Sequence, residues 1–159
     1  MRQLILIRHI KSSWSDPSLK DFDRPIKKSR IGDLEKVLSK VQDRIGIPDL
    51  ILVSASKRTR QTFKVMEKTM GKKQLKAQVV FSEILYECSA NDLATTLGNY
   101  RDSFEKIWVI GHNPGLTEFI NRELNFILPN LPTSGLFVWE KNEAGEENCW
   151  NCFPKSLEY

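Results

Sequence analysis

The feature that most constrains this chain is a repeated alternation of short strand-like segments with longer helical patterns. Continuous apolar runs such as 4–7, 50–53 and 107–110 are typical of strands buried on both faces of a sheet. Two later segments flank the polar stretch from Asn142 to Glu146, which indicates a hairpin. The strands expected on this basis are 4–7, 50–53, 77–81, 107–110, 135–139 and 148–153.

Apolar residues recur at helical spacing in four regions between these strands. The helices expected from this spacing are 34–45, 59–70, 93–97 and 116–127. The polar segment 12–30 is expected to be a long loop. Strands that alternate with helices form mostly parallel sheets with helices on both faces. We therefore predict an α/β fold with three layers (α/β/α), a mostly parallel sheet of about six strands, and a single domain over 1–159.

Composition narrows the class of protein further. The net charge of +4 suits anionic substrates but does not by itself indicate nucleic-acid binding. An odd number of cysteines argues against a disulfide-stapled secreted fold. The apolar run near the N-terminus is too short for a signal peptide or a membrane span, so we expect a cytoplasmic protein without membrane contact.

The chain has only two histidines, His9 and His112, which excludes a multi-histidine metal site. Cys149 and Cys152 form a C-x-x-C match, but a zinc site would need two more ligands. The other candidates are the two histidines and Cys88, so we interpret the thiols as structural. We expect neither a metal nor another cofactor.

Reactive or anion-binding side chains follow three of the expected parallel strands. Arg8 and His9 follow the first strand, 54–58 with Arg58 follows the second, and 111–115 with His112 follows the fourth. The carboxyl ends of parallel strands share one edge of the sheet, where ligands bind. Taken singly, each feature could be a loop residue, a solvated arginine or a plain turn. Together they favour one functional site.

These residue types suit phosphoryl transfer. Arginine presents a charged planar fork that matches phosphoryl oxygens and stabilises charge during transfer. A neutral imidazole is a nucleophile toward phosphorus, and nearby guanidinium groups lower its pKa. Arg8 and Arg58 would therefore bind substrate and keep His9 neutral, while His112 could donate a hydrogen bond to the phosphoryl group.

The order of these motifs resembles that of the histidine phosphatase superfamily, which has the phosphoglycerate-mutase-like fold. The similarity is greatest to its small SixA-type phosphohistidine phosphatase branch and covers nearly the whole chain. The segments that carry the resemblance are Leu4–Trp14, Asp21–Ile26, Pro48–Thr62, Leu85–Glu87, Val109–Leu116 and Pro132–Ser134.

The resemblance implies roles for the residues that match its motifs. His9 is the nucleophile that becomes phosphohistidine, Arg8 and Arg58 bind the phosphoryl group, and His112 completes the pocket. Glu87 lies where larger members carry an acidic residue and is the candidate general acid, although an exposed loop glutamate is an equal alternative. Weaker acid candidates are Glu83 and Asp21.

Other positions near the motifs are secondary candidates or departures. Lys11 and Ser15 could bind substrate, as could Lys57 and Trp14, but most surface lysines are simply solvated and a loop tryptophan more often anchors the loop. Ile10 stands where the family usually has glycine or alanine, so its backbone must be ordinary. Arg30 replaces a glycine before the first helix.

The expected function is metal-independent hydrolysis through phosphohistidine at His9, with a phosphorylated protein as the first substrate class. A small-molecule phosphomonoesterase using the same site is the alternative enzyme. A mutase fits less well, because so short a chain has little to close over a small substrate. A non-catalytic module that binds phosphorylated partners is the alternative from another class. The sequence does not indicate the oligomeric state.

Overall fold

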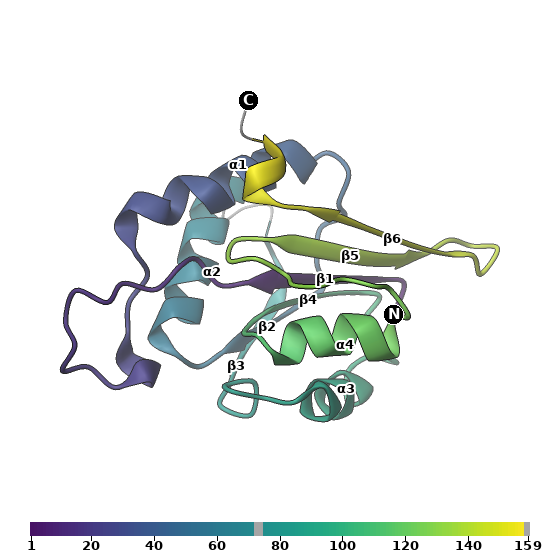
Figure 1. Ribbon diagram of the computed structural model, residues 1–159. Coiled ribbons are helices and arrows are strands. Elements are labelled where there is room, and N and C mark those ends of the chain that lie inside the picture. The colour runs from purple at the N-terminus through teal and green to yellow at the C-terminus, as the bar shows by residue number, and fades with distance from the viewer. Residues whose placement is uncertain (72–74, 158–159) are drawn as a thin grey trace.

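The expected strands form one six-stranded sheet in the computed structural model, which describes residues 1–71 and 75–157 (Figure 1). Their spatial order is β3-β2-β4-β1-β5-β6. Strands β1 to β4 are mutually parallel, whereas β5 runs antiparallel to both β1 and β6. The bounds are β1 (Gln3–Arg8), β2 (Leu50–Ser54), β3 (Gln78–Ser82), β4 (Lys106–Gly111), β5 (Leu136–Lys141) and β6 (Glu147–Cys152).

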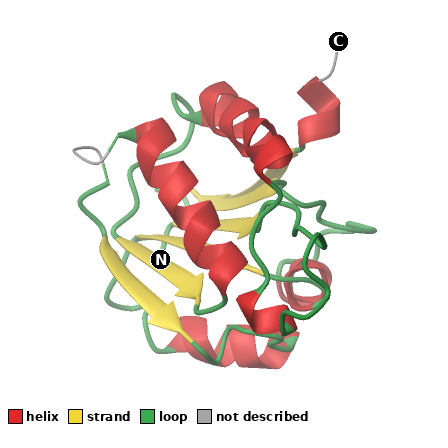
Figure 2. Cartoon of the chain, turned by 90° about the vertical axis from the view of Figure 1, so that its left-hand side faces the viewer, coloured by secondary structure: helices red, strands yellow, loops and turns green. Residues whose placement is uncertain are grey.

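Two helices cover each face of this sheet, so that the strands lie between helical layers (Figure 2). One face packs on α1 (Ile31–Val41) and α2 (Lys57–Met70), and the other on α3 (Ala90–Gly98) and α4 (Gly115–Glu123). The alternation of side chains along β1 produces this division, because successive side chains of a strand point to opposite faces. Ile5 and Ile7 join the first core, and Leu4 and Leu6 join the second.

The three-layer α/β/α fold and the mostly parallel six-stranded sheet predicted from the sequence are thus confirmed. None of the described helices is long and apolar enough to cross a membrane.

Two helices are shorter than their apolar spacing predicted. The first ends at Val41, and Ile45 is buried in the turn that follows, where its amide donates to the Val41 carbonyl at 3.0 Å. The fourth ends at Glu123, and the Ile127 side chain is 93% exposed. The Asn121 side chain binds the Leu128 amide at 2.7 Å and the Leu128 carbonyl at 2.9 Å. These bonds draw the chain out of the helical path.

The segment 12–30 is more ordered than a simple loop. It contains the short 3-10 helices Asp21–Asp23 and Lys28–Arg30. Its two ends pair through an antiparallel bridge between Ser12 and Ile26. Backbone bonds from Ser13 to Pro25 at 2.8 Å and from Lys27 to Lys11 at 2.7 Å extend this pairing. We call the paired residues 11–13 and 25–27 the ribbon. It brings Asp21 toward the carboxyl edge of the sheet, where Arg58 lies.

Candidate active site

His9 lies immediately beyond β1, at the carboxyl edge of the sheet, and only 7% of its surface is exposed. Its amide donates to the Gly111 carbonyl at 3.2 Å, and its carbonyl accepts from the Ser134 amide at 3.2 Å. The ring Nδ1 lies 2.7 Å from the Ile10 carbonyl. Because a carbonyl oxygen only accepts, Nδ1 carries the proton, and Nε2 keeps its lone pair. The imidazole is therefore held in the tautomer whose Nε2 can attack an electrophile.

The surroundings of His9 keep its imidazole neutral. The pKa of His9 is lowered to about 4, mainly by burial, with the charges of Arg58 and Arg8 acting in the same direction and the hydrogen bond to the Ile10 carbonyl and the charge of Asp21 opposing them. The two arginines act in the predicted direction, but desolvation is the larger cause. At neutral pH, His9 is a neutral base and a competent nucleophile.

Arg58, on the first turn of α2, contacts two other side chains of this site, Asp21 and His112. Its Nη1 donates to the Asp21 carbonyl at 2.7 Å and its Nη2 to Asp21 Oδ2 at 3.0 Å. Nη2 also lies 3.3 Å from His112 Nδ1. The site therefore holds Arg58 between an imidazole and a carboxylate.

His112, immediately after β4, packs against His9 with ring centroids 5.2 Å apart. Since a guanidinium only donates, His112 Nδ1 accepts from Arg58, and Nε2–H donates to the Ser54 hydroxyl at 2.7 Å. Burial lowers the pKa of His112 to about 3, with His9 and Arg58 adding to the effect. His112 is placed where we expected it, but both of its ring nitrogens already have protein partners in this structure.

Three arginines in the described structure carry buried side-chain nitrogen atoms without a hydrogen-bond partner. These are Nε of Arg8 and Arg58, and both Nε and Nη1 of Arg24. Arg8 donates through Nη1 to the Leu131 carbonyl at 3.0 Å, and its pKa is lowered by burial and by Arg58. Buried donors are almost always satisfied in folded proteins, so unsatisfied ones need an explanation. An oxyanion with several acceptor lone pairs would supply the missing partners.

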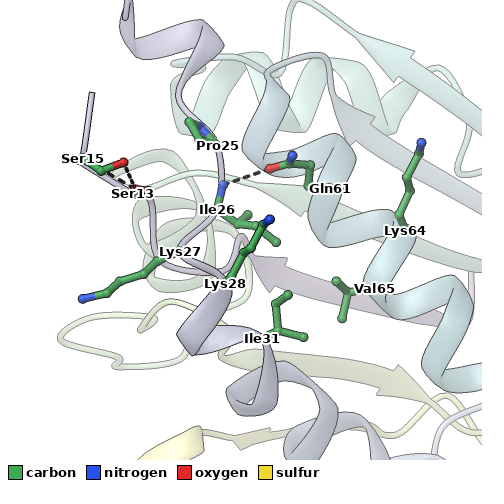
Figure 3. A pocket seen from close by; sticks show the side chains of 10 residues that line it. All are labelled: Ser13, Ser15, Pro25, Ile26, Lys27, Lys28, Ile31, Gln61, Lys64 and Val65. Atoms are coloured by element: carbon green, nitrogen blue, oxygen red, sulfur yellow. Dashed lines mark hydrogen bonds between the residues drawn. The ribbon is translucent and has the colours of Figure 1, made fainter. Parts of the chain in front are cut away.

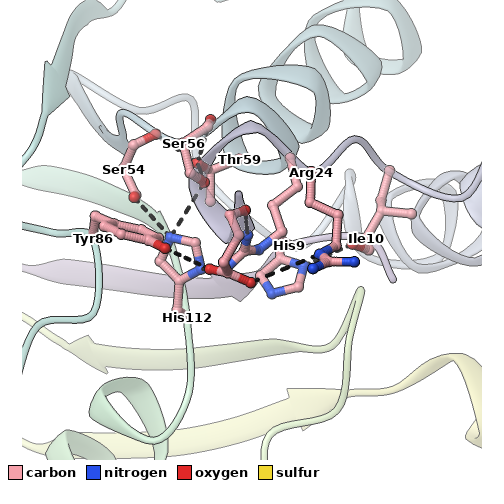
Figure 4. Close-up of polar contacts among 10 residues, drawn as sticks. His9, Ile10, Arg24, Ser54, Ser56, Thr59, Tyr86 and His112 are labelled. Carbon is pink, nitrogen blue, oxygen red and sulfur yellow. Dashed lines mark hydrogen bonds and ion pairs between the residues drawn. The ribbon is translucent and has the colours of Figure 1, made fainter. Parts of the chain in front are cut away.

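Asp21 and Tyr86 complete the polar network around Arg58. Figure 4 shows the labelled Tyr86, His112 and His9 side chains of this region. The Tyr86 hydroxyl donates to Asp21 Oδ2, and the Tyr86 ring stands edge-on to His112 with centroids 5.5 Å apart. Burial opposes ionisation of Asp21, but the hydrogen bonds from Tyr86 and Arg58 outweigh it and lower the pKa of that carboxyl. Burial and Asp21 raise the pKa of Tyr86 to about 12. Asp21 is therefore an anion, and Tyr86 a neutral donor, at neutral pH.

The acid candidate Glu87 does not join this network. It is exposed, with a left-handed backbone (φ 51°), and the ring that contacts His112 is that of its neighbour Tyr86. Glu83 is also exposed. From the sequence we chose Glu87 as the acid, but the side chain that reaches the site is that of the preceding residue, Tyr86.

Sequence reasoning also missed Arg24, which is buried and lies 3.9 Å from Asp21 Oδ1. The Trp14 ring, 69% exposed, stacks on it with 3.4 Å between the guanidinium carbon and the ring centroid. The signal was present, because Arg24 stands in the segment 21–26 that resembles the family. Burial of an arginine with unpartnered N–H groups is visible only in three dimensions.

The remaining candidates lie outside the His9 network. Lys11 and Lys57 are exposed. Ser15 is exposed, lies 3.0 Å from the Ser13 hydroxyl, and lines a separate cavity rather than the His9 site. Ile10 has an ordinary backbone, and its amide donates to Thr62 Oγ1 at 3.0 Å, so the departure at this position creates no strain. Arg30 caps the start of α1 and pairs with Asp33. Within the described ranges, no three His, Cys, Asp or Glu side chains cluster as metal ligands.

Comparison with known proteins adds relatives to this geometry. No family model matches the chain. An uncharacterized chloroplastic protein of Arabidopsis thaliana is 36% identical over 124 residues, which cover 74% of this chain and 56% of that protein. The chain thus spans little more than half the length of this curated relative. The cytoplasmic location expected from the sequence stays a prediction.

Solved structures match over nearly their full lengths. The Agrobacterium tumefaciens SixA, provisionally named a phosphohistidine phosphatase, is 26% identical with a TM-score of 0.74, covering 87% of this chain and 91% of that one. The protein histidine phosphatase SixA in complex with tungstate gives a TM-score of 0.80 at 19% identity, over 98% and 99% of the two chains. The α-ribazole phosphatase of Shigella flexneri gives 0.65 at 13% identity, over 89% and 91%.

Proposed function

We propose that this chain, which belongs to the histidine phosphatase superfamily and resembles its SixA branch, hydrolyses phosphoryl groups through a phosphohistidine at His9. One observation carries the proposal. His9 presents a neutral Nε2 beside Arg8 and Arg58, both of which have buried N–H groups without partners. A phosphoryl group would satisfy these donors and place its phosphorus near the nucleophile.

The reaction has two steps. The Nε2 lone pair of His9 attacks phosphorus, an N–P bond forms, and the bond from phosphorus to the leaving group breaks with its electron pair on that group. Water then attacks the phosphorylated His9, and the N–P bond breaks to give inorganic phosphate and the free imidazole. The arginines stabilise the charge on the phosphoryl oxygens in both transition states. The tungstate complex of a SixA relative is consistent with an oxyanion at such a site.

The substrate proposed first is phosphohistidine in a protein. Proton donation to the leaving group is weakly provided here, since Asp21 is ionised and Glu87 is exposed. A leaving imidazole needs less help from an acid than a leaving alkoxide. The alternative is a small phosphomonoester, which is favoured by the shared fold of the α-ribazole phosphatase. A module that binds phosphorylated partners without turnover is the remaining alternative.

Trapping of the phosphoenzyme tests the proposal. The protein is incubated briefly with labelled phosphoramidate and the reaction is then quenched. We expect a covalent adduct that is labile to acid and stable to alkali. The adduct should be absent in His9→Ala and present, at a reduced rate, in His112→Gln. An adduct that persists in His9→Ala refutes the assignment, and binding without any adduct or phosphate release favours the non-catalytic module. A panel of phosphohistidine peptides and sugar phosphates then separates the two substrate classes.

A further inference from the structure

A cavity of about 520 Å³ lies between the ribbon and the middle of α2. Figure 3 shows the side chains that line it. Neither His9 nor any other residue of the phosphoryl site lines it. The function proposed above therefore leaves it without a role. Its lining residues are Ser13, Ser15, Pro25, Ile26, Lys27, Lys28, Ile31, Gln61, Lys64 and Val65. We call this cavity the ribbon groove.

The lining combines an apolar floor with a basic rim. Ile26 is buried, and Ile31 and Val65 are half-buried, whereas Lys28 and Lys64 are exposed. The lining includes three lysines and no acidic residue. Exposed lysines with no anion among them give a positive potential, so the groove complements an acidic ligand that also carries an apolar side chain.

Gln61 adds a directed hydrogen-bonding group. Its Oε1 accepts from the Ile26 amide at 2.9 Å, which fixes the side chain against the ribbon. The opposite end of the same amide is an NH2 group that only donates. The groove therefore offers donors at its wall as well as cations at its rim, and both kinds of group recognise carboxylates.

The ribbon connects the groove with the phosphoryl site. His9 precedes Ser13 by four residues, which in extended chain is at most about 14 Å. The Ile10 amide binds Thr62, the neighbour of Gln61. Trp14, whose sequence neighbours Ser13 and Ser15 line the groove, is exposed and stacks on Arg24, which itself lies 3.9 Å from Asp21 Oδ1 of the phosphoryl site. Exposed aromatic residues of this kind are frequent anchors in protein interfaces. The path from site to groove thus has the length of a few residues of extended peptide.

We propose that the ribbon groove binds an acidic segment of the phosphorylated protein, a few residues from the phosphorylated side chain. The inference rests on the proposed phosphatase function. A polypeptide occupant follows from the short span between the two sites and from the exposed Trp14, which adjoins the groove residues Ser13 and Ser15 in the sequence. An acidic sequence with an apolar side chain follows from the lysines around an isoleucine and valine floor.

Charge reversal tests this inference. The double variant Lys28→Glu and Lys64→Glu should raise KM about tenfold for a phosphohistidine peptide flanked by Glu and Leu. It should leave the hydrolysis of phosphoramidate unchanged within about twofold, because phosphoramidate fills only the phosphoryl site. A peptide with Lys in place of Glu should show the reverse preference. The matched control carries Lys40→Glu and Lys155→Glu, two exposed lysines outside the groove, and should behave like wild type.

Three outcomes overturn the inference: equal losses on both substrates, an equal effect of the control pair, or no effect on the acidic peptide. A binding arm separates this from failure of the phosphatase proposal. An unphosphorylated, fluorescein-labelled Glu-Leu peptide should bind wild type and lose at least about fivefold in affinity with the groove variant. If this holds while phosphoramidate is not hydrolysed, the groove stands and the phosphatase proposal falls. If phosphoramidate is hydrolysed and the peptide does not bind, the groove falls alone.

Discussion

Asp21 is hydrogen-bonded to the guanidinium of Arg58, which the proposed reaction needs for binding its substrate. Its backbone carbonyl and Oδ2 accept from Nη1 and Nη2 of Arg58, so an incoming phosphoryl group that takes these donors must displace Asp21. The substitution Asp21→Asn removes the competing charge and keeps the size and an acceptor oxygen. We predict that this variant binds oxyanions more tightly than wild type.

The magnitude follows from the contact itself. A hydrogen bond to a charged group contributes about 1.5–3 kcal/mol, whereas an exposed ion pair contributes about 0.2–1 kcal/mol. The Asp21 side chain is 46% exposed and that of Arg58 only 8%, so the pair lies between these cases. Displacing the carboxylate therefore costs about 1–2 kcal/mol. Removal of its charge should lower the Kd for an oxyanion by about 5- to 30-fold.

Calorimetric titration with tungstate measures this Kd directly and requires no turnover. Tyr86→Phe is the matched control, because it removes a donor to Asp21 but leaves the carboxylate on Arg58. Its effect on tungstate binding should be smaller than that of Asp21→Asn. Weaker binding by Asp21→Asn than by wild type would refute the reasoning and show that Asp21 orients Arg58 for the anion.

Two further predictions concern stability. The folded pKa values of about 4 for His9 and about 3 for His112 lie below the unfolded value of about 6.5, so the unfolded chain binds more protons as pH falls below 6.5. From pH 7 to 5, each imidazole should remove about 2 kcal/mol from the free energy of unfolding in urea. His9→Gln should lose about 2 kcal/mol less than wild type, and equal losses would contradict the burial argument. Gly115→Ala should destabilise the fold by about 1–3 kcal/mol, because a Cβ there would collide with the Cys88 carbonyl. Gly98→Ala, at an open helical position, should instead be neutral or stabilising by up to about 1 kcal/mol, and a similar loss in both variants would contradict the steric reason.

The inner strands β1, β2 and β4 were predictable because burial on both faces requires a continuous apolar run, which is a local pattern. The end of α4 was not, because it depends on the Asn121 side chain binding Leu128, seven residues away. Apolar residues such as Leu124 and Ile127 continue the helical spacing beyond the helix itself. The spacing of apolar residues shows which side chains can be buried together. It does not show which hydrogen bonds to the backbone compete with the helix.

Some residues of the site were likewise predictable from the sequence, and others were not. His9 and His112 were predictable because the ends of parallel strands must converge at one edge of the sheet. Arg24 and Tyr86 were not, since they lie on loops whose course depends on distant pairings such as the Ser12–Ile26 bridge. An acidic residue was preferred to an aromatic one for its chemistry, and the backbone places Tyr86 rather than Glu87 against His112.

His9 and Asp21 lie on parts of the backbone that are expected to differ in the free energy needed to unfold them. β1 is an interior strand of the sheet, between β4 and β5, and the His9 amide continues its hydrogen bonding to Gly111. We expect the amide hydrogens of this strand to be among the slowest to exchange with solvent. The Asp23 amide, by contrast, donates to the Lys20 carbonyl within a short 3-10 turn in which Asp21 and Asp23 are exposed, so we expect this turn to open by local fluctuation. We therefore expect mild denaturant to free Asp21 from Arg58 at a lower concentration than is needed to disturb β1 and His9.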